Sequence, residues 1–181
     1  MKFTRIPESA FKELVLNAGY LATTFDPTAG TAPEESALLG ATTGGINFSA
    51  VPSFADFGED IDNCPKNMKE LKQIESWDVK CSGTYVSASS ANVKSMLGAA
   101  EETTTSKVSK ITPRNDLKDS DFTDLWLLCD YSDKHGTTNG GFCAIHMLNT
   151  LSTGGFSLQT GDKAKGQMSF EYTAHYSITS Q

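Results

Sequence analysis

The chain has 181 residues, a mass of 19.5 kDa and a formal net charge of −7. This length is typical of one domain, and the lack of an apolar run of about 18 residues excludes a transmembrane helix. The negative charge argues against nucleic-acid binding, which needs clustered Lys and Arg, but not against a surface past which DNA slides. No signal peptide is expected, because residues 1–21 lack a continuous apolar stretch.

The first expected strand lies around Leu14–Thr24, and alternating apolar and polar residues predict a second strand over 46–50. A long polar excursion at about 50–73 follows, and the next strand begins near Ile74. Connections in compact domains are usually about 4–6 residues long, and longer ones tend to be functional or disordered. Asn67–Lys72 is compatible with a short helical turn.

The excursion retains aromatic and large apolar residues, which disordered segments lack. We expect a neighbouring subunit to bury them, because a loop outside the main sheet needs another surface for its apolar side chains. The expected contact residues are Phe54, Asp56, Phe57, Glu59, Asp60, Asp62 and Met68.

The third strand starts at Ser76, with Trp77, Val79, Cys81 and Tyr85 on its apolar face and Asp78, Lys80, Ser82 and Thr84 on its polar face. A helix follows, capped by Ser90 and carrying an apolar stripe at helical spacing. That stripe consists of Val93, Met96, Leu97 and Ala100. Glu101–Lys110 is polar and is interpreted as a linker.

Two segments are apolar throughout, Leu125–Cys129 and Phe142–Leu148, and turn-forming residues between them predict a hairpin. A second turn within Leu158–Gln167 leads into a last strand that alternates from Met168 to Ile178. The sum is a mainly β fold. We predict a single domain over 1–181, a β-sandwich or partly closed barrel of about seven strands with one flanking helix.

Metal and nucleotide motifs fit poorly. A calcium loop starting at Asp60 has Cys64 and Leu71 at ligand positions, and one starting at Asp119 has Asp124 in place of the turn glycine. Gly161–Gln167 has glycines at phosphate-loop spacing but no lysine where one is needed. A zinc site from Cys64, Cys129 and His146 has no supporting spacing. No cofactor is expected.

Catalytic motifs are also missing. The three histidines, His135, His146 and His175, are far apart in sequence and form no HExxH, and GxSxG does not occur. The four cysteines form no CxxC pair and are expected to be reduced thiols. An acidic cluster at Asp116, Asp119, Asp121 and Asp124 is either a solvated turn, a subunit contact or a cation site. We therefore expect no enzyme.

Three segments together resemble the major tail (tail tube) proteins of long-tailed bacteriophages and related prophages. They are GATTGGINFSAVPSFADFGEDIDNCPKNMKELK, ITPRNDLKDSDFTDLW and NGGFCAIHMLNTLSTGGFSLQTGDKAKGQMSFEYTAHYSI. They cover well over half of the chain. Their specificity lies in their occurring together and in this order.

The resemblance implies a small β-sandwich that assembles into hexameric rings, which stack into a hollow tube. Genomic DNA and the tape-measure protein would pass through the lumen, the long early loop would contact the adjoining ring, and tail-tip and terminator proteins would be further partners. No membrane would be involved. The protein would belong to the virion tail and be assembled in the cytoplasm of the host bacterium.

Six copies at −7 each give about −42 per ring, and an acidic wall repels phosphate, so DNA would slide without specific binding. The candidates for the luminal surface are Asp78, Lys80, Gln167, Glu171 and His175. An outer solvated face is the alternative for the same residues.

Two alternative functions remain at this point. A tail-terminator ring or the tube of an injection system would share the fold. A monomeric carbohydrate- or cation-binding β-sandwich belongs to a different class and would place aromatic side chains with carboxylates in a concave site, around Trp126 or within 116–130.

Overall fold

A computed structural model describes residues 6–131 and 141–178. The fold is mainly β, with six strands in one antiparallel sheet and two in a separate hairpin. The strands are β1 (Val15–Ala22), β2 (Thr42–Asp56), β3 (Lys72–Tyr85), β4 (Ala100–Thr105), β5 (Val108–Pro113), β6 (Thr123–Tyr131), β7 (Phe142–Ser152) and β8 (Met168–Thr173). The helices are α1 (Ser90–Leu97) and the short 3-10 helices η1 (Glu8–Phe11), η2 (Glu35–Ala37) and η3 (Asp119–Asp121).

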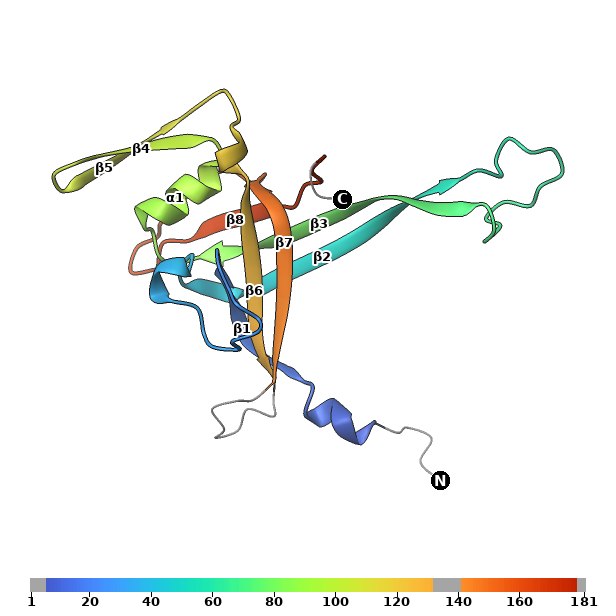
Figure 1. Cartoon of the computed structure of the whole chain (residues 1–181). Helices are drawn as coiled ribbons and strands as arrows, with labels where there is room; N and C mark the ends of the chain where they lie inside the picture. The colour runs from blue at the N-terminus through green and yellow to red at the C-terminus, as the bar shows by residue number, and fades with distance from the viewer. Residues whose placement is uncertain (1–5, 132–140, 179–181) are drawn as a thin grey trace.

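The large sheet has the strand order β1-β6-β7-β8-β3-β2. Among the described residues, the β7–β8 ladder that joins its two halves is short and pairs Leu151 with Thr173 and Ser152 with Tyr172. The sheet bends at this point, so that the inner faces of β1-β6-β7 and of β8-β3-β2 approach each other (Figure 1). This arrangement confirms the mainly β prediction with one α-helix.

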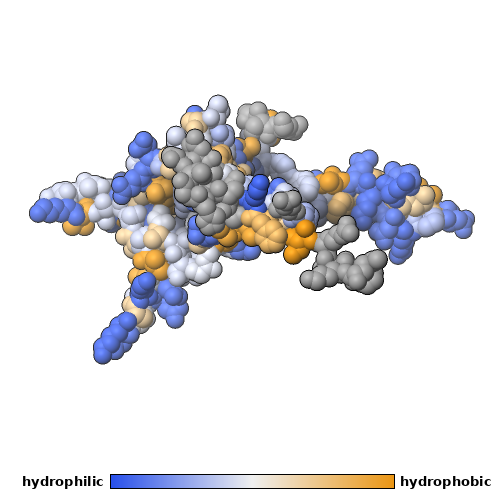
Figure 2. Space-filling view, turned by 90° about the horizontal axis from the view of Figure 1, so that it is seen from below, coloured by the Kyte–Doolittle hydropathy of each residue, from blue (hydrophilic) through white to orange (hydrophobic). Residues whose placement is uncertain are grey.

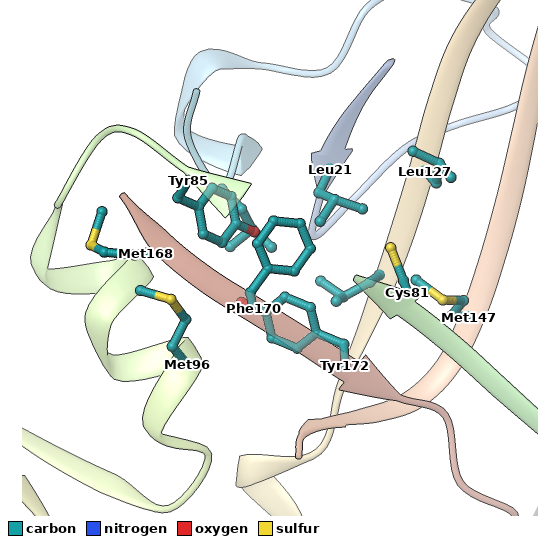
Figure 3. Close-up of a cluster of buried hydrophobic side chains, with 11 residues drawn as sticks. Leu21, Cys81, Tyr85, Met96, Leu127, Met147, Met168, Phe170 and Tyr172 are labelled. Carbon is teal, nitrogen blue, oxygen red and sulfur yellow. The ribbon is translucent and has the colours of Figure 1, made fainter. Parts of the chain in front are cut away.

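The core fills the space inside the bend. Leu21, Leu125 and Met147 from one half meet Cys81, Phe170 and Tyr172 from the other. Met96 of α1 closes the cluster beside Met168, as Figure 3 shows. The phenol of Tyr85 stacks on Phe170 with ring centroids 4.2 Å apart. The alternation of β3 and β8 read from the sequence therefore assigns their inner faces correctly.

Some predicted boundaries were wrong. The strand pair β2–β3 extends from Thr42↔Tyr85 to Asp56↔Lys72, with two shifts of register on the way, so the connecting loop is 57–71 rather than 50–73. Phe54 and Asp56 thus lie on a strand. The helical turn expected at Asn67–Lys72 is absent there: separate turns lie at 66–67 and 69–71, and Lys72 begins β3. The segment read as a polar linker is the hairpin β4–β5, because a Thr-rich run pairs well across a ladder.

Two end positions also differ from the prediction. The hydroxyl of Ser89, not Ser90, caps α1 by accepting the backbone N–H of Asn92 at 3.1 Å. The last strand ends at Thr173, so its alternation does not extend to Ile178.

Three parts of the molecule project from this small core. Figure 1 shows the β2–β3 hairpin on one side, the β4–β5 hairpin on the other and the N-terminal segment below. A compact monomer of this mass exposes about 8,500 Å², whereas this chain exposes 12985 Å². The fold leaves about half as much surface again as a compact monomer would.

Candidate subunit interface

The outer part of the β2–β3 hairpin, residues 52–77, is called the arm. Its strands carry the inner face of the sheet outward. Phe48, Ala50, Pro52 and Phe54 share one face of β2, opposite Cys81, Val79, Trp77 and Ile74 of β3. Cys81 is 0% exposed, Trp77 is 45% exposed, and Phe54 and Ile74 are 51% and 52% exposed. The same face of the β2–β3 hairpin is therefore part of the core at its base and about half exposed at its outer end.

We call Pro52, Phe54, Ile74 and Trp77 the arm strip. A bulge at Glu75 lets Phe54 oppose Ile74, and the Lys72 ammonium lies 4.9 Å from the Phe54 ring centroid. Pro52 lacks an N–H and is tolerated because β2 is an edge strand. Within the described residues β2 pairs only with β3, so one edge of a 15-residue strand has no partner strand. Such edges favour pairing with another chain.

The loop at the end of the arm is ordered by one carboxylate. Asp56 accepts the backbone N–H of Gly58 and that of Asn67, both at 3.0 Å. These two bonds hold the pKa of the Asp56 carboxyl below its usual value. Phe57 N–H also bonds to the Leu71 carbonyl at 3.1 Å. Asp56 therefore has a structural role that the sequence did not indicate.

The other predicted contact residues of the arm lie on this loop. Phe57 and Ile61 are exposed, although each is large and apolar. Met68 is half-buried because its sulfur lies 3.3 Å from that of Cys64. The acidic residues Glu59, Asp60 and Asp62 are exposed around them. Figure 2 shows the resulting surface, a largely hydrophilic arm end with hydrophobic residues among the charges.

An apolar groove of about 300 Å³ lies where the arm leaves the body. It forms in the split between β7 and β3, beyond the short β7–β8 ladder. We call it the root groove; its lining residues are Trp77, Val79, His146, Met147, Leu148, Asn149, Ala174, His175 and Tyr176. The hydroxyl of Tyr176 accepts the backbone N–H of Trp77 at 2.7 Å, which links the C-terminal segment to the arm.

Three of the five luminal candidates come together on the outer face of the sheet. Asp78 and Lys80 form an ion pair at 2.9 Å on β3. Glu171 of β8 lies opposite Ser82 and accepts the hydroxyl of Thr153 at 3.0 Å. The hydrogen bond and charge of Asp78, with the charge of Glu171, raise the pKa of Lys80. The surface is mixed in charge.

The other two candidates lie elsewhere. Gln167 precedes β8 and bridges to Gln159, at the base of the segment that connects β7 with β8. His175 lies beyond the end of β8, where its ring packs edge-on against Phe122 and its Nδ1 is 3.2 Å from the Asn149 carbonyl oxygen. The sequence placed His175 on the polar face by continuing the alternation of the last strand, but that strand ends at Thr173.

Three of the four residues of the acidic cluster predicted at 116–124 are divided between two partners. Arg114, which the sequence did not single out, binds Asp121 at 2.6 Å and also approaches Asp116 and Glu101. The hydrogen bond from the Lys118 backbone N–H lowers the pKa of Asp121, and the hydrogen bond and positive charge of Arg114 lower it further. Asp124 instead lies 3.2 Å from His146 Nε2. Within the described residues no group of three potential metal-ligating side chains gathers.

Trp126 is packed on both sides. His146 of β7 stacks on it with centroids 3.9 Å apart and a 4° interplanar angle. Phe25, from the segment after β1 on the other side of β6, meets it edge-on at 5.4 Å. A sugar-binding tryptophan needs an open ring face, so this arrangement does not favour a carbohydrate site here. His135 lies outside the described residues.

Two of the four thiols, those of Cys81 and Cys129, behave as small apolar groups. Burial raises the pKa of Cys81 to about 12 and also raises that of Cys129. Cys129 and Cys143 lie opposite each other on β6 and β7 as free thiols.

No helix among the described residues is long and apolar enough to cross a membrane. No protein-family model matches the chain, and no curated protein matches it. The functional assignment therefore depends on the residues and their geometry.

Proposed function

We propose that the chain is a structural subunit of a bacteriophage tail, which self-assembles into hexameric rings that stack into a hollow tube for DNA. The observation that carries this proposal is the arm strip. Apolar side chains that continue the core face need a surface to cover them, and the described residues leave about half of Phe54 and of Ile74 exposed. A neighbouring copy is the surface that a self-assembling subunit always has available.

The amount of exposed surface supports the same proposal. The excess over a compact monomer is about 4,500 Å². A standard protein interface takes about 800 Å² from each partner. A subunit in a stack of rings has neighbours beside, above and below it, and this surplus is large enough for several such contacts.

The loop residues fit the centre and rim of an interface. Phe57 and Ile61 are apolar side chains that association would desolvate, while Glu59, Asp60 and Asp62 around them would stay hydrated. Under this proposal the resemblance to tail tube proteins and the physical reading assign the same segment to the contact between rings.

The polar outer face of β3 and β8 is the proposed luminal surface, with Asp78, Lys80 and Glu171 exposed or half-buried there. Replacing Glu171 with Lys would add positive charge to the path of the DNA. We expect assembly to persist and DNA passage to slow in Glu171→Lys particles. Unchanged infectivity would remove Glu171 from the lumen.

The test of the proposed assembly is to remove the end of the arm without cutting its strands. Asp56 and Lys72 are paired across the hairpin, so residues 57–71 can be replaced by Asn-Gly, which favours a tight hairpin turn. We expect a folded, soluble subunit that no longer stacks, as seen by circular dichroism and electron microscopy. Normal tubes from this variant would contradict the proposal.

A further inference from the structure

A stack of identical subunits needs two different surfaces on every chain. Contacts that repeat head to tail are heterologous, so a projection on one copy must meet a complementary hollow on the next. The arm end, with Phe57 and Ile61 exposed, supplies the projection. The following inference rests on the proposed function and concerns the hollow.

The root groove has the required character. Its walls include Trp77, Leu148 and Tyr176, which are large, apolar or aromatic, and exposed. Its volume of about 300 Å³ far exceeds the roughly 10–15 Å³ that a cavity needs to hold one water. It can therefore accept bulky side chains.

Another cavity of comparable size differs in chemistry. The cavity of about 340 Å³ beside α1 presents the charged groups of Lys94, Glu102 and Asp121 together with several hydroxyls. Burying Phe57 or Ile61 against the charged groups of Lys94 and Glu102 would desolvate those groups without replacing their hydrogen bonds to water, which costs free energy. The root groove carries no Asp, Glu, Lys or Arg in its lining.

The arm of the same chain cannot fill this groove. Trp77 lies at the groove, and the strand continues from it to Lys72 before the loop begins, a distance of about 16 Å at about 3.3 Å per residue. The side chains of the arm end are therefore directed to another molecule. The proposed function makes that molecule a second copy, and the surface surplus of the chain is large enough for such a contact.

We propose that the root groove of one copy receives the arm end of a second copy, with Phe57 and Ile61 inserted against Trp77 and Leu148. Each copy then offers one arm and one groove, so the contact propagates without limit. The C-terminal segment forms part of the receiving surface through Ala174, His175 and Tyr176.

The native thiol of Cys64 provides the test. Its backbone N–H bonds to the Ile61 carbonyl at 3.1 Å, which fixes it within the arm end. The variant Leu148→Cys places a second thiol in the groove at an exposed position. The full-length protein is concentrated, treated with a short bismaleimide and separated on a denaturing gel. We expect a ladder of covalent multimers, because head-to-tail contacts link many chains.

Three matched controls accompany this experiment. The parent chain and Leu158→Cys, whose new thiol is equally exposed but outside the groove, should give no ladder above background. Adding Phe57→Ser to Leu148→Cys should abolish it. A ladder of equal yield in Leu158→Cys, or a product that stops at the dimer, would overturn the proposal.

Electron microscopy of the same samples separates this proposal from the proposed function. Tubes without a Leu148→Cys ladder would leave the tube intact and overturn the groove assignment. A ladder without rings or tubes would support the groove and contradict the tail tube. Monomers alone at every concentration, with no ladder, would overturn both.

Discussion

The two ends of the β2–β3 hairpin present the same sheet face in opposite surroundings. At the base, Cys81 lies beside Tyr172 of the neighbouring strand, within the core cluster, and is fully buried. At the outer end, Phe54 and Ile74 on that face remain half exposed. The same strand face carries apolar side chains at both ends of the hairpin. At the base other parts of the fold cover this face, and at the outer end they do not.

This difference separates what stabilises the subunit from what assembles it. Side chains at the base gain their burial when the chain folds. Side chains on the arm strip gain theirs only when another molecule covers them. Substitutions at the base should therefore lower the stability of the single subunit, and substitutions on the arm strip should impair assembly instead. Four predictions test this difference, from the largest expected effect to the smallest.

The largest effect is expected in the core. Phe170 is 3% exposed and stacks on Tyr85, so Phe170→Ala should cost about 3–5 kcal/mol of unfolding free energy, as core Phe truncations do. Urea unfolding of the dilute protein measures this. A loss below about 1 kcal/mol would show that the core is not where the structure places it.

A smaller loss is expected from overpacking. A Cβ at Gly83 would lie 2.7 Å from the Phe170 ring, which cannot move because Tyr85 stacks on it. Gly83→Ala should cost about 1–3 kcal/mol in the same urea experiment. The control is Gly166→Ala, where the new Cβ would make an ordinary 3.4 Å contact. Equal losses for both variants would contradict the packing at Gly83.

Substitutions in the arm strip should impair assembly and leave the stability of the single subunit nearly unchanged. The double variant Phe54→Ser, Ile74→Ser should change the stability of the dilute subunit by less than about 0.5 kcal/mol per site, because surface sites rarely cost more. It should nevertheless abolish assembly, measured by sedimentation velocity of the concentrated protein.

The matched control for the arm strip lies on the same strand. Val51 is 57% exposed but belongs to the opposite face, across from Asp78. Val51→Ser should leave assembly intact. If Val51→Ser and the double variant impair assembly equally, loss of apolar surface in general, and not the arm strip, would be responsible.

The smallest expected effect is a loss of local order in the loop 57–71. Because the pKa of Asp56 is lowered in the folded protein, its bonds contribute order above the ordinary carboxyl pKa of about 3.9 and lose it as pH falls through the lowered value. Asp56→Asn should make amides of 57–71 exchange faster at neutral pH, with core amides unchanged. Hydrogen exchange measures this, and Asp60→Asn is the control. Unchanged loop exchange would contradict the role of Asp56.

The sequence predicted the inner faces of the strands well, because a two-residue alternation survives in β3 and β8 wherever one face is buried. The sequence did not predict the end of β2 correctly. Ser53, Ala55 and Asp56 have low strand propensity, and they are in a strand because β3 pairs with them. The sequence also predicted a linker at β4–β5, because a hairpin outside the core shows no apolar alternation.

The candidate interface could be predicted only in part. The apolar residues at Phe54 and Phe57 were visible in the sequence because they stand in a polar context. The root groove was not, because Trp77, Leu148 and Tyr176 are separated by long stretches of chain and meet only through the bend of the sheet. Arg114 gave no signal either, since its role depends on η3 returning beside β5.

The most direct measurement is negative-stain electron microscopy of the purified protein at high concentration, with the double variant Phe54→Ser, Ile74→Ser beside it. The account predicts six-fold rings and hollow tubes from the wild-type protein and unassembled subunits from the variant. Wild-type protein that remains monomeric at high concentration, or tubes that form equally from the variant, would contradict it.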